Sequence, residues 1–148
     1  MAVNLQFYKL KLVKENLAQY NAVSKQLNTP KKVVDLINAL ELNTEPEEVL
    51  SLITVDVKNN VTGIFEVSRG HLSASIAHPR EIFKRAILNN AHGIFLVHNH
   101  PSGDVTPSKA DIEVTKTIKK SGELLQIKLI DHIIVGDGCY SFLENGYI

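Results

Sequence analysis

Cysteine, surplus charge and long hydrophobic runs are all scarce in this sequence. Its single cysteine, Cys139, has no second cysteine with which to form an internal disulfide, and this fits a reducing compartment. Sixteen basic residues balance sixteen acidic ones, whereas proteins that bind nucleic acids usually carry a basic excess. No apolar stretch approaches the roughly 20 residues that span a bilayer. These absences predict a cytoplasmic protein without a membrane partner, and they disfavour a nucleic-acid-binding function.

The opening section differs in character from the rest of the 148 residues. Residues 4–13 alternate apolar and polar side chains, which is typical of an edge strand and not of a signal peptide. Two helical patterns and an acidic, proline-bearing segment follow, over residues 16–27, 30–40 and 41–49. We therefore predict that residues 1–48 form an integral extension of one domain, whose main part is residues 49–148.

Short β-rich and helical patterns fill the remainder of the chain. Strands are expected where β-branched and aromatic residues are enriched, and helices where apolar residues recur every three or four positions. The expected strands are residues 50–57, 63–70, 72–77, 93–98, 124–136 and 139–148. The expected helices are residues 78–90 and 107–122, the second ending at Gly122. This order predicts an α/β fold in which helices sandwich a mixed β-sheet.

The most informative stretch is VHNHPSGDVTPSKAD, residues 97–111. His98 and His100 stand two residues apart at the end of a buried strand, where alternate side chains point to the same side. Asp111 lies one turn into the following helix, and its spacing from the apolar residues of that helix turns its carboxylate inward. A buried carboxylate needs a partner or a metal ion. Two histidine nitrogens and one aspartate oxygen, with a fourth position open to water, are a typical ligand set for catalytic zinc.

Each part of this stretch also has a purely structural interpretation. Either histidine alone could be a hydrogen-bonded core or turn residue. Ser108 and Asp111 match the Ser-x-x-acid capping pattern that precedes an apolar helical run, and PSGD is equally an ordinary turn. The combined pattern is His-x-His, seven residues, Ser, two residues and Asp, and it is much more specific than its parts. It predicts a zinc site formed by His98, His100 and Asp111.

These residues resemble the RadC-like branch of the JAB/MPN domain proteins, whose JAMM motif adds a remote glutamate to the pattern just described. The resemblance includes HPREIFKRAI and LIDHIIVGDG and covers roughly residues 50–142. It implies a metalloprotease-like α/β fold in which the two histidines and the aspartate hold zinc. It also implies that a glutamate, here Glu66, acts on the metal-bound water, and that Ser108 helps to stabilise the developing oxyanion.

Two features depart from the family pattern. Full-length RadC-like proteins usually carry a helix-hairpin-helix region upstream, whereas a segment of different character precedes the domain here. Asn99 stands where many isopeptidases of the wider family have Ser or Thr. The substrate is therefore less well defined than the metal.

The chemistry of the residues themselves indicates the same class of reaction. Zinc held by neutral histidines and a carboxylate acidifies a water molecule and polarises a carbonyl group. A carboxylate that is not a ligand can accept the water's proton and pass it to the leaving amine, and we expect Glu66 to do so. Glu66 could instead be an exposed strand residue, and Glu81 competes for the role, although it lies where an acid stabilises a helix start. His78 and His132 could orient the ligands or could be packing residues.

The sequence therefore predicts a zinc metallopeptidase or isopeptidase that cleaves an amide bond of a protein or peptide. An accessory protein in DNA repair or other nucleic-acid processing is one alternative, and it rests on the RadC resemblance alone. A non-catalytic, zinc-stabilised interaction module is another. The sequence identifies neither the scissile bond nor the oligomeric state.

Overall fold

The computed structural model describes residues 3–15, 23–70 and 77–148 of the chain. The helices in these ranges are α1 (Pro30–Ala39), the short 3-10 helix η1 (Leu42–Thr44), α2 (Pro79–Leu88) and α3 (Lys109–Leu125). The strands are β1 (Val49–Val55), β2 (Val61–Arg69), β3 (Gly93–Asn99), β4 (Lys128–Val135) and β5 (Cys139–Ser141). They form one mixed sheet in the order β2-β1-β3-β4-β5. β3 and β4 are parallel, and the other neighbouring strands are antiparallel.

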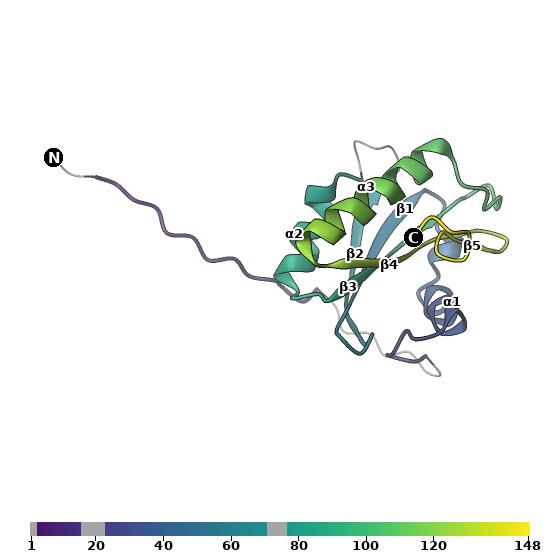
Figure 1. Cartoon of the computed structure of the whole chain (residues 1–148), viewed down its shortest axis with the longest axis horizontal. Coiled ribbons are helices and arrows are strands. Elements are labelled where there is room, and N and C mark those ends of the chain that lie inside the picture. Colours follow the sequence, from purple (N-terminus) through teal and green to yellow (C-terminus); the bar gives the residue numbers. More distant parts are fainter. Residues whose placement is uncertain (1–2, 16–22, 71–76) are drawn as a thin grey trace.

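Helices cover both faces of this sheet (Figure 1). α2 and α3 pack on one face, where Ile82 and Ile118 join Leu96 of β3 in one core cluster. α1 packs on the other face, where Ile37 joins Phe95 of β3 in a second cluster. β3 is buried along its whole length because it lies in the middle of the sheet with both faces covered. The expected α/β fold, with helices on either side of a mixed sheet, is confirmed.

The strand expected at residues 4–13 is not present. Residues 3–15 form no strand or helix, and they run away from the domain (Figure 1). Their side chains are exposed. Alternating apolar and polar side chains favour a strand only where a neighbouring strand satisfies the backbone groups. No strand of the described ranges pairs with this segment, and the expectation of an edge strand is therefore wrong.

Two further expectations fall partly or wholly on residues that the structure does not describe. The helix expected at residues 16–27 lies outside the described residues up to residue 22, and residues 23–27 are not helical. In that part Gln26 forms an isolated β-bridge with Asn60. The strand expected at residues 72–77 lies outside the described residues, apart from its last position.

The helix that was expected to stop at Gly122 continues to Leu125. It ends at Gln126, whose positive φ of 57° reverses the direction of the chain. The chain then folds back so that the N–H of Ile127 donates to the carbonyl of Gly122 at 2.9 Å. A side chain at position 122 would collide with the carbonyl of Ile127. The glycine is therefore needed for the close approach of α3 and the entry to β4, and not for ending the helix.

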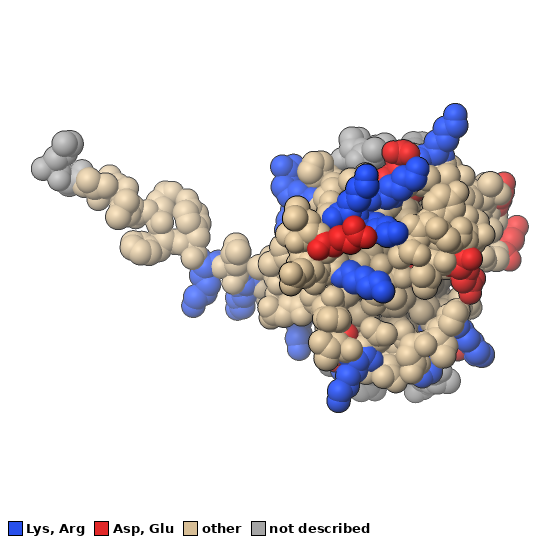
Figure 2. Space-filling model, in the orientation of Figure 1, with Lys and Arg blue, Asp and Glu red and all other residues tan. Residues whose placement is uncertain are grey.

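Charges of both signs share the surface. On the face shown in Figure 2, Lys and Arg side chains lie over α2 and α3 with acidic side chains among them. On α2, for example, Glu81 pairs with Lys84 at 2.7 Å and with Arg85 at 3.2 Å. Within the described ranges, no helix combines the length and the hydrophobicity that crossing a membrane requires.

Candidate metal centre

The end of β3 brings the two histidines together. His98 is only 1% exposed, and like Leu96 two residues earlier it points to the face that α3 covers. His100 follows the last residue of the strand, and its Nε2 lies 3.0 Å from the Nε2 of His98. The two imidazoles therefore converge, as the alternation of an extended strand predicts.

Asp111, in the first turn of α3, completes this group. Its Oδ1 lies 3.2 Å from Nε2 of His98, and its Oδ2 lies 3.5 Å from Nε2 of His100. The carboxylate therefore faces both imidazoles. That the three residues hold a metal ion stays a prediction.

Ser108 and Asp111 also form a complete capping box at the start of α3. The Asp111 N–H donates to Oγ of Ser108 at 3.1 Å, and the Ser108 N–H donates to Oδ2 of Asp111 at 2.6 Å. The structural and the chemical interpretations of this pair are therefore compatible, because capping occupies Oδ2 while Oδ1 faces His98. The cap holds the carboxylate in place beside the imidazoles.

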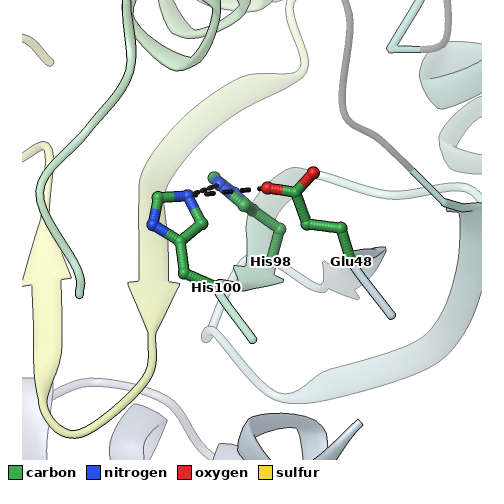
Figure 3. A group of neighbouring side chains, drawn as sticks. All are labelled: Glu48, His98 and His100. Carbon is green, nitrogen blue, oxygen red and sulfur yellow. Dashed lines mark hydrogen bonds and ion pairs between the residues drawn. The ribbon is translucent and has the colours of Figure 1, made fainter. Parts of the chain in front are cut away.

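A second carboxylate, which no motif in the sequence indicates, lies beside the histidines. Glu48 directly precedes β1, and its Oε1 is 3.7 Å from Nε2 of His100. One potential ligand atom from each of Glu48, His98 and His100 lies within 4.8 Å of the others (Figure 3). The Glu48 side chain is 22% exposed, whereas that of Asp111 is 2% exposed. A molecule that approaches from solvent therefore meets Glu48 before it meets Asp111.

Asn99 fixes the backbone on both sides of Glu48. Because Asn99 alternates with the two histidines, its side chain points to the opposite face of the sheet. Its Nδ2 donates to the carbonyls of Glu45 at 3.1 Å and Glu47 at 2.8 Å, and its Oδ1 accepts from the N–H of Val49 at 2.8 Å. The segment His-Asn-His thus supplies two imidazoles to one face and positions a carboxylate from the other.

Replacing Asn99 with alanine should free the segment that carries Glu48. The change leaves buried backbone groups without their partner, so we expect the free energy of unfolding to fall by about 2 to 3 kcal/mol. Zinc affinity should change little, because His98, His100 and Asp111 remain in place. Chemical denaturation and a zinc titration would measure the two effects, with the exposed Asn28→Ala as a matched control. Equal stability of the Asn99 and Asn28 variants would contradict the positioning role.

The structure does not bring Glu66 to this centre. A shift in register near the start of β1 pairs Glu66 with Ser51, which in turn pairs with Val97. Val97 belongs to the cluster under α1, so Glu66 lies on the opposite face of the sheet from His98. Its carboxylate accepts hydrogen bonds from Arg69 at 3.0 and 2.9 Å. The expectation that Glu66 is the base of this centre is therefore corrected, because the side chain is a half-exposed partner of an arginine.

The three remaining candidate residues, His78, Glu81 and His132, have different surroundings. His78 caps α2, where its Nδ1 accepts from the N–H of Arg80 at 3.1 Å, and Glu81 pairs with basic residues on the same helix. His132 of β4 is fully buried, and its Nε2 lies 2.9 Å from Nδ1 of His98. Burial, followed by the charges of the neighbouring imidazoles, holds the pKa of His132 well below its usual range. Only His132 of these three therefore contacts the centre.

The donor atoms of the centre fit a bound zinc ion. Nδ1 of His100 lies 2.7 Å from the carbonyl oxygen of Asp104, and because a carbonyl only accepts, this nitrogen carries the proton. Nε2 of His100 therefore presents a lone pair toward His98 and Asp111. Lone pairs and carboxylate oxygens that converge in a buried site repel one another unless a proton or a metal ion lies between them. Imidazole nitrogens and carboxylate oxygens are ligands that zinc prefers.

A cavity of about 760 Å³ opens beside the centre. Its lining residues come from the segment before β1, the end of β2 and the loop that follows β3. They are Pro46, Glu47, Glu48, Gly70, His100, Pro101, Ser102 and Ser108. Glu48 and Ser108, the candidate for stabilising an oxyanion, therefore border one space.

A mixed α/β fold with histidines and carboxylates at one end of its sheet is consistent with the class of JAB-domain proteins. The chain belongs to the RadC-like JAB domain family, whose model matches residues 27–147. This confirms the resemblance carried by the His-x-His stretch. The match begins upstream of α1 and includes Glu48, while the division of the chain at residue 48 stays a prediction.

Several curated relatives carry the name UPF0758 protein. One from Clostridium beijerinckii is 44% identical over 124 residues, which are 83% of this chain and 54% of the relative. Another from Chlorobaculum parvum is 51% identical over 105 residues, covering 70% of this chain and 47% of the relative. A third from Desulfitobacterium hafniense is 39% identical over 140 residues, covering 94% of this chain and 61% of the relative. The chain thus spans about half the length of the curated relatives it matches.

Proposed function

We propose that this domain is a zinc-dependent hydrolase that cleaves an amide bond of a protein or peptide. The observation that carries the proposal is the meeting of two imidazoles with a buried carboxylate, Asp111, beside a cavity that a second carboxylate, Glu48, also borders. A binding module would not need a second, solvent-facing carboxylate at the same point. We also propose a cytoplasmic location, which the lone exposed thiol of Cys139 suits.

His98, His100 and Asp111 are the proposed zinc ligands. All three side chains are buried or nearly so, and a buried ligand set holds its geometry better than an exposed one. Zinc, when bound, supplies Lewis acidity that polarises a substrate carbonyl and acidifies a water molecule. Asp111 is the better ligand of the two carboxylates, because it lies against both imidazoles and its capping bonds restrict its movement.

Glu48 is the proposed general base, in place of Glu66. Its carboxylate lies near His100 and borders the cavity, so it can accept a proton from a water molecule there. The same carboxyl group can then donate that proton to the leaving amine. Asn99 holds the backbone on either side of Glu48, which keeps the carboxylate aimed at this space.

Ser108 is the proposed source of a hydrogen bond to the developing oxyanion. Its Oγ accepts from the N–H of Asp111, and this leaves the hydroxyl proton to donate. The residue borders the cavity together with His100 and Glu48. A donor at this place would stabilise negative charge that develops on a carbonyl oxygen next to the ligands.

Zinc reconstitution coupled to a peptide screen tests the proposal. We expect about one zinc ion per chain and cleavage of a peptide library that stops in a chelator and resumes when zinc is restored. His98→Ala should abolish both, whereas the exposed His92→Ala should change neither. Failure to bind stoichiometric zinc would overturn the proposal. A zinc-loaded protein that leaves peptides intact and binds DNA at physiological salt would favour the nucleic-acid alternative.

A further inference from the structure

A buried series of hydrogen-bonded polar groups lies behind the centre, on the side away from the cavity. The Thr115 hydroxyl lies 2.7 Å from the backbone carbonyl of Asp111 and 2.7 Å from Nδ1 of His132. Nε2 of His132 in turn lies 2.9 Å from Nδ1 of His98. These side chains are at most 1% exposed. Because no bulk water reaches such groups, each must find its partner within the chain.

The direction of each hydrogen bond follows from the first acceptor. A carbonyl oxygen only accepts, so the single proton of the Thr115 hydroxyl is donated to Asp111. The hydroxyl must then accept from Nδ1 of His132, which therefore carries a proton. In a neutral imidazole the other nitrogen has a lone pair, so Nε2 of His132 accepts from Nδ1 of His98. His98 is left with its Nε2 lone pair facing His100 and Asp111.

We propose that Thr115 and His132 are positioning residues that set the tautomer and the ring orientation of His98, with the Asp111 carbonyl as their fixed reference. The inference rests on the proposed metal centre, since a lone pair on Nε2 is the form that a ligand needs. In this arrangement Asp111 acts twice. Its carboxylate faces Nε2 of His98 directly, and its carbonyl determines, through two side chains, which nitrogen of His98 carries the proton.

Several elements of the fold fix the positions of Thr115 and His132. Thr115 lies one turn after Asp111 on α3, so the two groups share one rigid helix. A shift in register between β3 and β4 pairs His132 with Leu96, which turns His132 to the face that α3 covers. The His132 ring stacks on Phe142, with centroids 4.8 Å apart and planes 10° apart. The His132 ring therefore has little freedom to rotate away from His98.

Removing the Thr115 hydroxyl should remove the constraint on the tautomers of His132 and His98. In Thr115→Val, Nδ1 of His132 has no acceptor, so His132 can move its proton to Nε2. His98 would then have to accept at Nδ1 and carry its own proton on Nε2, where the lone pair is needed. We expect zinc affinity to fall by about 10 to 100-fold, the usual scale for residues that orient a metal ligand. Thr115→Ser keeps the hydroxyl and should restore the wild-type value.

Nitrogen-15 NMR of the histidine side chains tests the inference directly on the metal-free full chain. At a pH where the imidazoles are neutral, wild type and Thr115→Ser should show His98 protonated at Nδ1, and Thr115→Val should show protonation at Nε2. Competition with a chromogenic chelator would give the zinc dissociation constants. Thr117→Val, an exposed change on the same helix, is the matched control. Amide spectra of each variant would establish that it is folded.

Two results would overturn the inference: protonation of His98 at Nε2 in metal-free wild type, or an unchanged tautomer and zinc affinity in folded Thr115→Val. A second variant, His132→Phe, should weaken zinc binding in the same direction, and unchanged affinity there would also count against the role. Failure of the proposed function is distinguishable, because absent zinc binding or peptide cleavage in wild type leaves the tautomer assignment to be decided by NMR alone.

Discussion

Replacing Glu48 with glutamine should lower the kcat of amide hydrolysis by about 100-fold or more, the usual scale for loss of a general base. The amide of glutamine has nearly the same shape as the carboxylate but cannot accept a proton from water at neutral pH. Zinc should stay bound, because His98, His100 and Asp111 are unchanged. Steady-state kinetics together with zinc analysis of the same sample would separate the two effects.

Glu66→Gln is the matched control for this variant. Its remaining side-chain oxygen can still accept from Arg69, and the residue lies on the opposite face of the sheet from the histidines, so kcat should stay at the wild-type value. A large loss of kcat in Glu66→Gln with normal kcat in Glu48→Gln would indicate that Glu66, the residue that the sequence motif suggested, is the base. Loss of zinc in Glu48→Gln would instead indicate that Glu48 is a zinc ligand.

Replacing Asp111 with asparagine should weaken zinc binding by more than 100-fold and abolish hydrolysis. An amide oxygen is a neutral and poorer ligand than a carboxylate, so the loss should exceed the 10 to 100-fold typical of residues that only orient a ligand. The capping box should largely survive, because an amide oxygen can still accept from the Ser108 N–H. In metal-free protein the free energy of unfolding should therefore fall by no more than about 1 kcal/mol.

Ser108→Ala provides the complementary control, because it removes the capping hydroxyl and keeps the Asp111 carboxylate. It should lose about 1 kcal/mol of stability and retain most of its zinc affinity. Bound metal stabilises the folded state, so wild type and Ser108→Ala should melt at a lower temperature in a chelator, whereas Asp111→Asn should shift little. Equal zinc dissociation constants for wild type and Asp111→Asn would show that Asp111 is a cap and not a ligand.

The positions of the two histidines and of Asp111 could be predicted because local rules determine them. Strand alternation puts His98 and His100 on one side, and the capping pattern locates the start of α3 and therefore the first helical turn that contains Asp111. Such rules need only the sequence within a few residues. The layers of the fold could be predicted in the same way, from buried strands alternating with amphipathic helices.

The position of Glu48 could not be predicted by the same reasoning. Glu48 follows an irregular segment, and its place depends on hydrogen bonds to Asn99, about fifty residues further along the chain. Glu66 was the preferred candidate because it fits the remote glutamate of the JAMM motif, but a shift in pairing register decides which face it occupies, and no local pattern indicates that shift. An acidic residue directly before β1 was the available signal, since an antiparallel partner of β3 starts where β3 ends.

Because side chains alternate along β3, the whole centre depends on the pairing register of this one strand. His98 faces α3, and Asn99 faces the segment before β1, only in the observed pairing with β1 and β4. A slip of one residue would send each side chain to the opposite layer. The imidazoles and the amide would then change places, and the pair of histidines and the anchor of Glu48 would be lost together. Deletion of one residue between α2 and β3 should therefore leave either the native register with the whole centre or a shifted register without it.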